Sequence, residues 1–162
     1  MIIRKPTRRE VLMLRGIANY QFGHPYGEKL IPDNITVSIS PTTKRIRNIY
    51  LNGKIIVTLR PSDFLFSLHM LGGEILRKYS PKPMFRVVVR DDVVEFVSEG
   101  RDVFAKHVVE VDLNLRAGSE VIVVDRYDNL LAVGRARLSP CEMLSFKRGI
   151  AVRVRHARRK TA

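Results

Sequence analysis

The alternation of apolar and polar side chains along the chain predicts several short strands. Residues 35–40 (ITVSIS) alternate and predict a strand. Residues 46–51 and 54–59 flank Asn52–Gly53, a dipeptide that favours the two-residue turn of a β-hairpin. The first half of the chain is therefore expected to contain part of an antiparallel sheet.

Helices are predicted where capping signals precede a longer stretch. Thr7 and Glu10 have the spacing of a capping box and lead into residues 9–22 (REVLMLRGIANYQF). Gly23 and a turn at residues 25–27 are expected to end this helix. A second, shorter helix is predicted over residues 71–79 (LGGEILRKY).

Residues 80–83 (SPKP) form the predicted boundary, because two prolines interrupt any periodic pattern. We expect an N-terminal domain over residues 1–80, a second domain over 84–157 and a flexible basic tail over 158–162.

The second half is denser in strands. Strands are predicted over 84–90, 107–112, 119–125, 130–138 and 150–158, and short helices over 91–100 and 139–149. About five short strands separated by turns favour a small barrel over a parallel sheet. The predicted fold class is α+β, with a small N-terminal α+β domain followed by a β-barrel with short helices.

The charge of the chain favours a polyanionic partner. The 162 residues carry 29 Lys and Arg against 16 Asp and Glu, a net charge of +13 with a pI near 10.5. Such a field attracts nucleic acid, although a generally basic proteome or a ribosome-associated surface would give the same balance. Residues 134–162 hold nine basic residues and a single acid, Glu142, which indicates one cationic face.

Other classes of protein are not favoured by the composition. No apolar stretch approaches the roughly 20 residues that span a bilayer, and no signal-peptide pattern follows the basic N-terminus. The single cysteine, Cys141, excludes an internal disulfide and a cysteine-cluster zinc site. We therefore expect a soluble cytoplasmic protein without a membrane partner.

Catalytic and metal-binding patterns are not found. The four histidines lack metal-ligand spacing, and Asp91, Asp92, Asp125 and Asp128 fit helix starts and turns. Cys141 has no identifiable base, and no glycine-rich phosphate loop is present. No catalytic residue, metal or cofactor is predicted.

Four motifs in the second half carry a resemblance. They are a G-x-x-V-x-x-x-x-V segment, A-G-S-E-V-x-V-V-D, L-A-V-G-R-A and the closing K-R-G-x-A-V-x-V. In this order they closely resemble the PUA domain, a small RNA-binding β-barrel of RNA-modifying enzymes. Residues 18–32 and 42–68 resemble the domain that precedes PUA in archaeal archaeosine tRNA-guanine transglycosylases. Together the resemblance covers about residues 10–156.

The resemblance leaves out the catalytic part of those enzymes, a large barrel with paired aspartates and a cysteine-rich zinc site. A (β/α)₈ barrel of about 250 residues does not fit beside the two units of this chain. The resemblance thus implies a non-catalytic RNA-binding protein that binds tRNA at its acceptor stem and 3′ end. It would serve as an accessory or split subunit of a tRNA-modification system, with a catalytic transglycosylase subunit as a possible partner. The alternatives are a ribosome-associated or translation factor, and an enzyme whose active site lies in the first unit.

The resemblance also implies an RNA-facing surface at the turn after the first helix of the PUA domain and at the strand that follows. The residues at these positions are Gly100, Arg101, Val103, Phe104, Lys106 and His107. Arg101 and Lys106 suit phosphates, whereas Phe104 or His107 suits an unpaired base. Gly100 would let the backbone approach a phosphate. His107 stands where the family often has glycine. In the alternative interpretation, Val103 and Phe104 belong to the core and Lys106 is a solvated edge charge.

A second cationic surface is predicted near the C-terminus. Its candidates are Arg135, Arg137, Lys147, Arg148, Arg153 and Arg155. The arginines alternate along two predicted strands, so that each pair shares a face. In a PUA barrel the last strand lies near the glycine turn, so this surface would extend the first one. Simple solvation of an outward face is the alternative, and a third basic patch at residues 42–47 is open to the same two interpretations.

Overall fold

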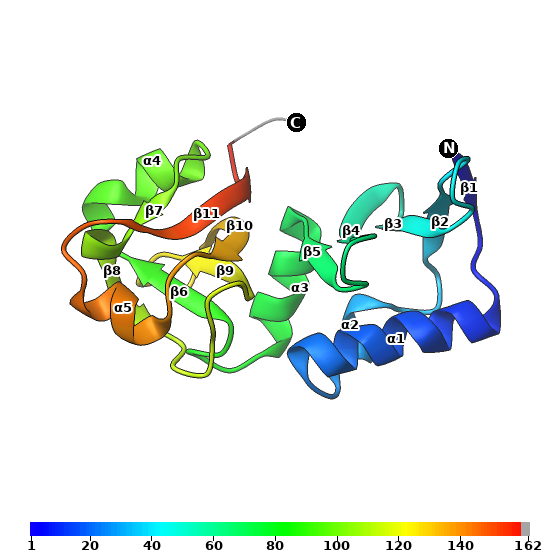
Figure 1. The fold of residues 1–162 in the computed structure, drawn as a ribbon, viewed down its shortest axis with the longest axis horizontal. Coiled ribbons are helices and arrows are strands. Elements are labelled where there is room, and N and C mark those ends of the chain that lie inside the picture. Colours follow the sequence, from blue (N-terminus) through cyan, green and yellow to red (C-terminus); the bar gives the residue numbers. More distant parts are fainter. Residues whose placement is uncertain (160–162) are drawn as a thin grey trace. The chain divides into compact units, whose positions relative to one another are not determined.

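The structure, a computed structural model, describes residues 1–159. It divides into two compact units, Met1–Tyr79 and a second unit that begins at Ser80. Each unit combines helices with one β-sheet (Figure 1), which confirms the predicted α+β class.

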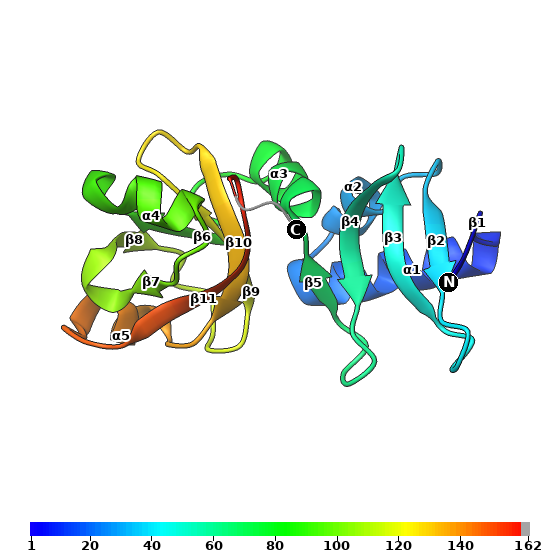
Figure 2. The same cartoon turned by 90° about the horizontal axis from the view of Figure 1, so that it is seen from above.

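The first unit is built on an antiparallel sheet with the order β1-β2-β3-β4-β5 (Figure 2). Its strands are β1 (Ile2–Arg4), β2 (Thr36–Ile39), β3 (Ile46–Leu51), β4 (Lys54–Leu59) and β5 (Phe66–Leu68). Its helices are α1 (Arg8–Phe22), α2 (Tyr26–Leu30) and α3 (Met70–Tyr79). The sequence pattern missed β1 and β5, because three residues are too few to display an alternation.

Local signals explain α1 and the β3–β4 hairpin. The Thr7 hydroxyl accepts the Glu10 N–H and the Glu10 carboxylate accepts the Thr7 N–H, which confirms the capping box. Asn52 and Gly53 have φ of +51° and +81°, as the predicted two-residue turn requires. The buried side chains of α1 are Val11, Leu14, Ala18 and Phe22, at the three- and four-residue spacing of one helical face.

The predicted turn at residues 25–27 is only partly correct. The chain turns after Gly23, but Tyr26 already begins α2. Its side chain is buried, so packing adds a helical turn that the local Pro and Gly signals did not indicate.

The second unit is a curled six-stranded sheet with the order β7-β11-β10-β9-β6-β8 (Figure 1). Its strands are β6 (Arg86–Val89), β7 (Val103–Phe104), β8 (Val108–Val111), β9 (Glu120–Val124), β10 (Leu130–Ala136) and β11 (Ile150–Ala157). The short helices are η1 (Asp91–Val93), α4 (Val94–Ser98), η2 (Ala105–His107) and α5 (Pro140–Ser145). β6 and β9 pair in parallel and the other neighbours are antiparallel. The sheet is a nearly closed barrel, as predicted, and η2 connects its two edge strands.

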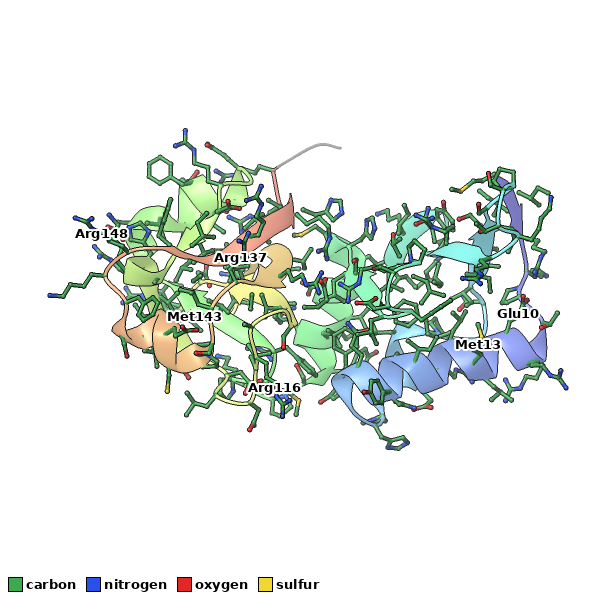
Figure 3. All side chains as sticks on the ribbon, viewed as in Figure 1. Glu10, Met13, Arg116, Arg137, Met143 and Arg148 are labelled. Atoms are coloured by element: carbon green, nitrogen blue, oxygen red, sulfur yellow. The ribbon has the colours of Figure 1, made fainter. Side chains whose placement is uncertain are left out.

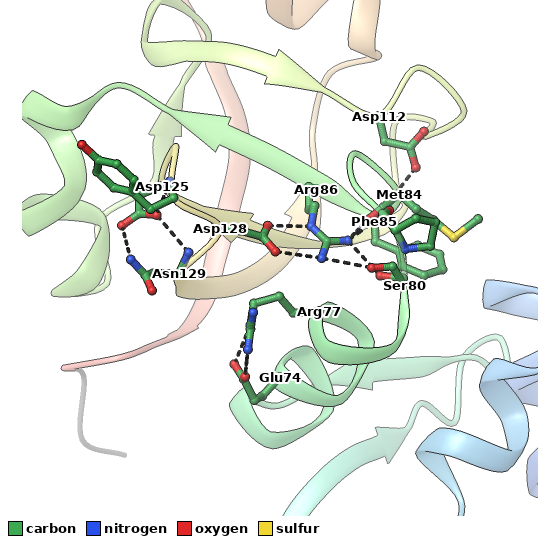
Figure 4. Close-up of polar contacts among 12 residues, drawn as sticks. Glu74, Arg77, Ser80, Met84, Phe85, Arg86, Asp112, Asp125, Asp128 and Asn129 are labelled. Atoms are coloured by element: carbon green, nitrogen blue, oxygen red, sulfur yellow. Dashed lines mark hydrogen bonds and ion pairs between the residues drawn. The ribbon is translucent and has the colours of Figure 1, made fainter.

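Arg86 is the most deeply buried of the four charged residues that the described part of the second unit encloses, which also include Asp112, Glu120 and Asp125. Arg86 is 2% exposed, and its Nε and Nη2 atoms donate to the Asp128 carboxylate at 2.7 and 3.0 Å (Figure 4). Its Nη1 atom donates to the Ser80 Oγ at 2.8 Å. Because buried charges must be paired and hydrogen-bonded, this network ties the start of the second unit to the β9–β10 turn.

The predicted flexible tail starts inside the ordered structure. The Arg158 N–H donates to the Leu131 carbonyl and the Arg159 N–H to the Ser98 carbonyl, both at 2.8 Å. Residues 160–162 lie outside the described residues. Among residues 1–159, no helix has the length and hydropathy needed to cross a membrane.

Candidate functional site

The end of α4 is shaped by a glycine and places an arginine over an aromatic ring. Gly100 has a φ of +104° and donates its N–H to the Val97 carbonyl, while the Arg101 N–H donates to the Phe96 carbonyl. These two bonds define a Schellman motif, in which the N–H groups of the two residues after the helix cap donate to carbonyls of the last helical turn. The Arg101 Cζ accordingly lies 5.4 Å from the centre of the Phe96 ring. The Gly100 amide is used to close the helix, so it is not free for the phosphate contact that the sequence suggested.

β7 follows directly and turns Phe104 outward. Val103 and Phe104 pair with Val152 and Ile150 of β11, and the Asp102 Oδ1 accepts the Val154 N–H at 2.9 Å. Val103 is 1% exposed and belongs to the barrel core, whereas Phe104 is 44% exposed. Val103 was predicted to contact RNA, but its side chain lies in the barrel core beneath this surface and is not accessible to a ligand.

Two hollows lie on either side of Phe104. One, of about 180 Å³, is lined by Val93, Phe96, Val97, Arg101, Asp102, Phe104 and His107. The other, of about 220 Å³, is lined by Phe104, Lys106, Lys147, Arg148 and Gly149. We call them the apolar hollow and the basic hollow. The Phe104 side chain lines both hollows.

His107 completes the apolar hollow. Its ring meets the Phe104 ring edge to face, with the centroids 6.1 Å apart and the planes at 86°. Burial lowers the pKa of the His107 imidazole below its ordinary value, and the positive charges of Lys106 and Arg90 lower it further. The ring is therefore neutral at physiological pH, which suits a stacking wall.

The cations around both hollows lack acidic partners. Within residues 1–159, Arg101, Lys106, Lys147 and Arg148 form no salt bridge. Lys147 and Arg148 lie between α5 and β11, and Figure 3 shows Arg148 at the outer tip of this loop. α5 ends at Ser145, earlier than the predicted Gly149, and this leaves both side chains on an exposed loop.

Four of the six residues predicted for the second surface line a groove on β10 and β11, called the arginine groove below, whereas Lys147 and Arg148 line the basic hollow. This groove, of about 670 Å³, is lined by Gly118, Arg135, Ala136, Arg137, Arg153, Val154 and Arg155. Arg135 and Arg153 are direct cross-strand partners, although like charges in that position repel. A Cβ on Gly134 would lie 2.2 Å from the Arg153 carbonyl oxygen. Glycine is therefore required at this position of β10, where the backbone of β11 approaches closely.

Arg155 differs from its neighbours in this groove. It forms an ion pair with Glu120, whose side chain is fully buried. Arg135, Arg137 and Arg153 are exposed, and the Arg135 Nε donates to the Gly118 carbonyl at 3.0 Å. Of the four predicted arginines, Arg155 is paired within the fold, whereas the other three form no salt bridge among residues 1–159.

Sequence reasoning missed Phe96 and Asp102. Phe96 is 50% exposed and forms a wall of the apolar hollow, although it was assigned only to a helix. The spacing F-x-x-x-G-R, which suits a Schellman motif, was the available signal. Asp102 gave none, because its partner in β11 is 52 residues away.

Thr58, Asn48 and His69 form a polar cluster on the first unit. The Thr58 hydroxyl donates to the Asn48 Oδ1 at 2.7 Å and lies 2.8 Å from the His69 Nε2. A hydroxyl has one proton, so with the Thr58 proton directed at Asn48 the His69 Nε2 is the donor to the Thr58 oxygen. Within the described residues, no group of three or more His, Cys, Asp or Glu side chains could hold a metal ion.

Comparison with known families agrees with this architecture. Residues 85–158 match the model of the PUA domain. The second unit is a PUA domain. Residues 13–83 match the patch-forming domain C2 of tRNA-guanine transglycosylase, so the chain is a C2–PUA module and the resemblance found in the sequence is confirmed.

The curated relatives of this chain are much longer than the C2–PUA module. The chain is 41% identical over 154 residues to the tRNA-guanine(15) transglycosylase of Methanobrevibacter smithii and 40% identical to that of Thermococcus kodakarensis. The two alignments cover 95% and 94% of this chain but only 23% and 26% of the two relatives. The C2–PUA module thus spans about a quarter of their length.

Solved structures of similar extent share the fold. A hypothetical protein from Pyrococcus horikoshii is 26% identical, with a TM-score of 0.76 over 99% of this chain and 96% of that one. A PUA domain protein from Aeropyrum pernix, 17% identical, has a TM-score of 0.73 over 99% of this chain and 88% of that one. The pairing of this first unit with a PUA domain therefore recurs in chains of similar length.

Proposed function

We propose that the chain binds RNA and that the two hollows beside Phe104 hold a single-stranded 3′ end of tRNA. The observation that most directly supports this proposal is the exposed Phe104 ring. Aromatic side chains line the hollow on one side of it, and the hollow on the other side is lined by three cations that form no salt bridge among residues 1–159. An unpaired base stacks on aromatic rings, and the adjoining phosphate is neutralised by Lys and Arg. The apolar hollow suits the base and the basic hollow suits the phosphate.

The arginine groove supports the same proposal. Arg135, Arg137 and Arg153 would contact the sugar–phosphate backbone of the acceptor stem next to the single-stranded end. Such contacts fix the position of an RNA without reading its sequence, which suits a module that binds many tRNAs.

The cellular role follows from the relatives. They are named for transglycosylation of a guanine in tRNA, and this chain corresponds to about a quarter of them. We infer that the module delivers tRNA in such a modification system, as a non-catalytic subunit beside a separate catalytic transglycosylase. Co-purification from native cells tests this role, because a transglycosylase should accompany the tagged protein, whereas a ribosomal subunit would favour a translation factor.

RNA binding is tested with a tRNA transcript and the same transcript trimmed of its 3′-terminal nucleotides. We expect the wild type to bind the trimmed RNA at least about fivefold more weakly, because a stacked base is lost. The double variant Arg101→Ala/Lys106→Ala should lose on the order of tenfold in affinity for the full transcript and keep its melting temperature. Equal affinity of the wild type for both RNAs would exclude the 3′-end site, and an unaffected double variant would place the RNA elsewhere.

A further inference from the structure

Two hairpin loops of the first unit repeat one hydrogen-bonding pattern. In each six-residue loop, the N–H of the first residue donates to the carbonyl of the sixth residue. The N–H of the fifth residue donates to the carbonyl of the first residue. These bonds, at 2.9 to 3.0 Å, join Ser40, Lys44 and Arg45 in one loop and Arg60, Phe64 and Leu65 in the other. The loops follow β2 and β4, so both leave the same end of the antiparallel sheet (Figure 2).

The fifth residue of each loop has a left-handed backbone. Lys44 has a φ of +62° and Phe64 a φ of +57°, in a region that favours glycine. Phe64 is a bulky residue there, and its ring is 46% exposed, so burial offsets little of the cost. Unfavourable backbone conformations persist where the surrounding structure enforces them, and they concentrate at functional sites.

The two loops present one combined surface. The Arg45 Cζ lies 5.1 Å from the centre of the Phe64 ring, which joins the loops through a cation–π contact. Within residues 1–159, neither Lys44 nor Arg45 forms a salt bridge. The only acid in the two loops is Asp63, and it is occupied by Arg60 and by the Leu65 N–H at 3.0 Å each.

We propose that Lys44, Arg45 and Phe64 form a second RNA contact, on the first unit and distinct from the hollows of the PUA domain. The exposed ring and the guanidinium stacked on it offer a platform for an unpaired base, and Lys44 neutralises a neighbouring phosphate. Ligand contact then accounts for a lysine and a phenylalanine at positions where the backbone favours glycine. The proposal rests on the proposed function in that the ligand is RNA.

A variant with glycine at both left-handed positions tests the proposal in the full chain. Lys44→Gly/Phe64→Gly removes one charge and one ring and relieves the backbone, so the melting temperature should stay equal or rise. Affinity for a full tRNA transcript should fall at least about fivefold, and the slope of log affinity against log salt should become shallower by about 0.7 to 0.9. Arg45→Gln, which leaves both loop conformations in place, should weaken binding in the same direction.

Asn52→Gly is the matched control. Asn52 also has a left-handed backbone, but it lies in the β3–β4 turn at the opposite end of the sheet, and its replacement should leave RNA affinity unchanged. Wild-type affinity in both loop variants would overturn the second contact and leave the hollows standing. A melting temperature that falls together with affinity would assign the loop side chains to the fold and also overturn it. A wild type that binds no tRNA would instead remove the proposed function itself.

Discussion

Phe104 is the residue whose role depended most on the fold. The sequence allowed it to be core or surface, and the structure turns it outward while Val103, its neighbour, enters the barrel core. Two residues of an edge strand thus face opposite sides, as the pleat of a β-strand requires. The ring between the two hollows is held by β11 on one side and meets the edge of His107 on the other.

Replacing this ring should affect binding more than stability. Phe104→Ala is expected to lower the free energy of unfolding by about 1 kcal/mol, well below the roughly 3 to 5 kcal/mol of a core phenylalanine. It should abolish the preference for untrimmed over trimmed tRNA. Thermal denaturation and parallel binding curves measure both effects. A loss of stability in the core range would show that the ring is buried in solution.

His107 should make stability sensitive to mild acid. Because its pKa is lowered in the folded state, the unfolded chain binds more protons as pH falls through the ordinary histidine range. The stabilisation is therefore complete above a pH of about 6.5 and is lost as pH falls through the lowered pKa. His107→Gln should show a smaller drop in melting temperature between pH 7.5 and 5.5 than the wild type. His24→Gln, at an exposed histidine that lines neither hollow, is the comparison variant.

At the scale of elements, β11 links the two candidate surfaces. One side of it pairs with β7, which carries Phe104, and the other pairs with β10, which carries Arg135 and ends just before Arg137. The loop before it supplies Lys147 and Arg148. A single strand therefore positions groups from both hollows and from the arginine groove, which keeps their spacing constant.

The arginines of this groove should separate into structural and binding roles. Arg155→Ala removes the ion pair of Arg155 with the buried Glu120 carboxylate, and we expect a loss of about 2 kcal/mol in stability. This is below the cost for a fully buried pair, because Arg155 retains some access to water. Arg153→Ala should leave the melting temperature unchanged and weaken RNA binding. Similar melting temperatures for both variants would contradict the assignment of Arg155 to the fold.

At the scale of the whole molecule, the chain consists of two units that each enclose their own sheet. The PUA domain starts earlier than its first strand, because the buried Arg86 needs Ser80 and the Pro81 and Met84 carbonyls as acceptors. The proline-rich segment is therefore part of the domain as well as its boundary.

A fragment that begins at residue 80 should fold alone and retain weak RNA binding. A fragment that begins at residue 84 should be less stable, because Arg86 loses the Ser80 acceptor and an unsatisfied buried donor costs about 1 to 3 kcal/mol. Circular dichroism during urea denaturation compares the two. An unfolded longer fragment would mean that the units depend on each other, and equal stabilities would mean that Ser80 is dispensable.

Local sequence signals determined the capping box of α1, the Asn52–Gly53 hairpin, the strand-rich second half and the cationic character of the protein. The resemblance to the PUA domain brought Arg101, Phe104, Lys106 and His107 forward as candidates, and their charge and aromaticity are properties of the residues themselves. These features rest on interactions between residues a few positions apart, which a linear pattern records.

Only the tertiary structure decided which candidates are available to a ligand. Arg155 and Arg153 are equivalent in the alternating pattern, yet one meets a buried carboxylate 35 residues earlier and the other faces the groove. Phe64 and Arg45 come together across two loops, although nothing in either segment alone indicates it. Exposure and charge pairing depend on contacts between distant parts of the chain, and these exist only once the strands are in register.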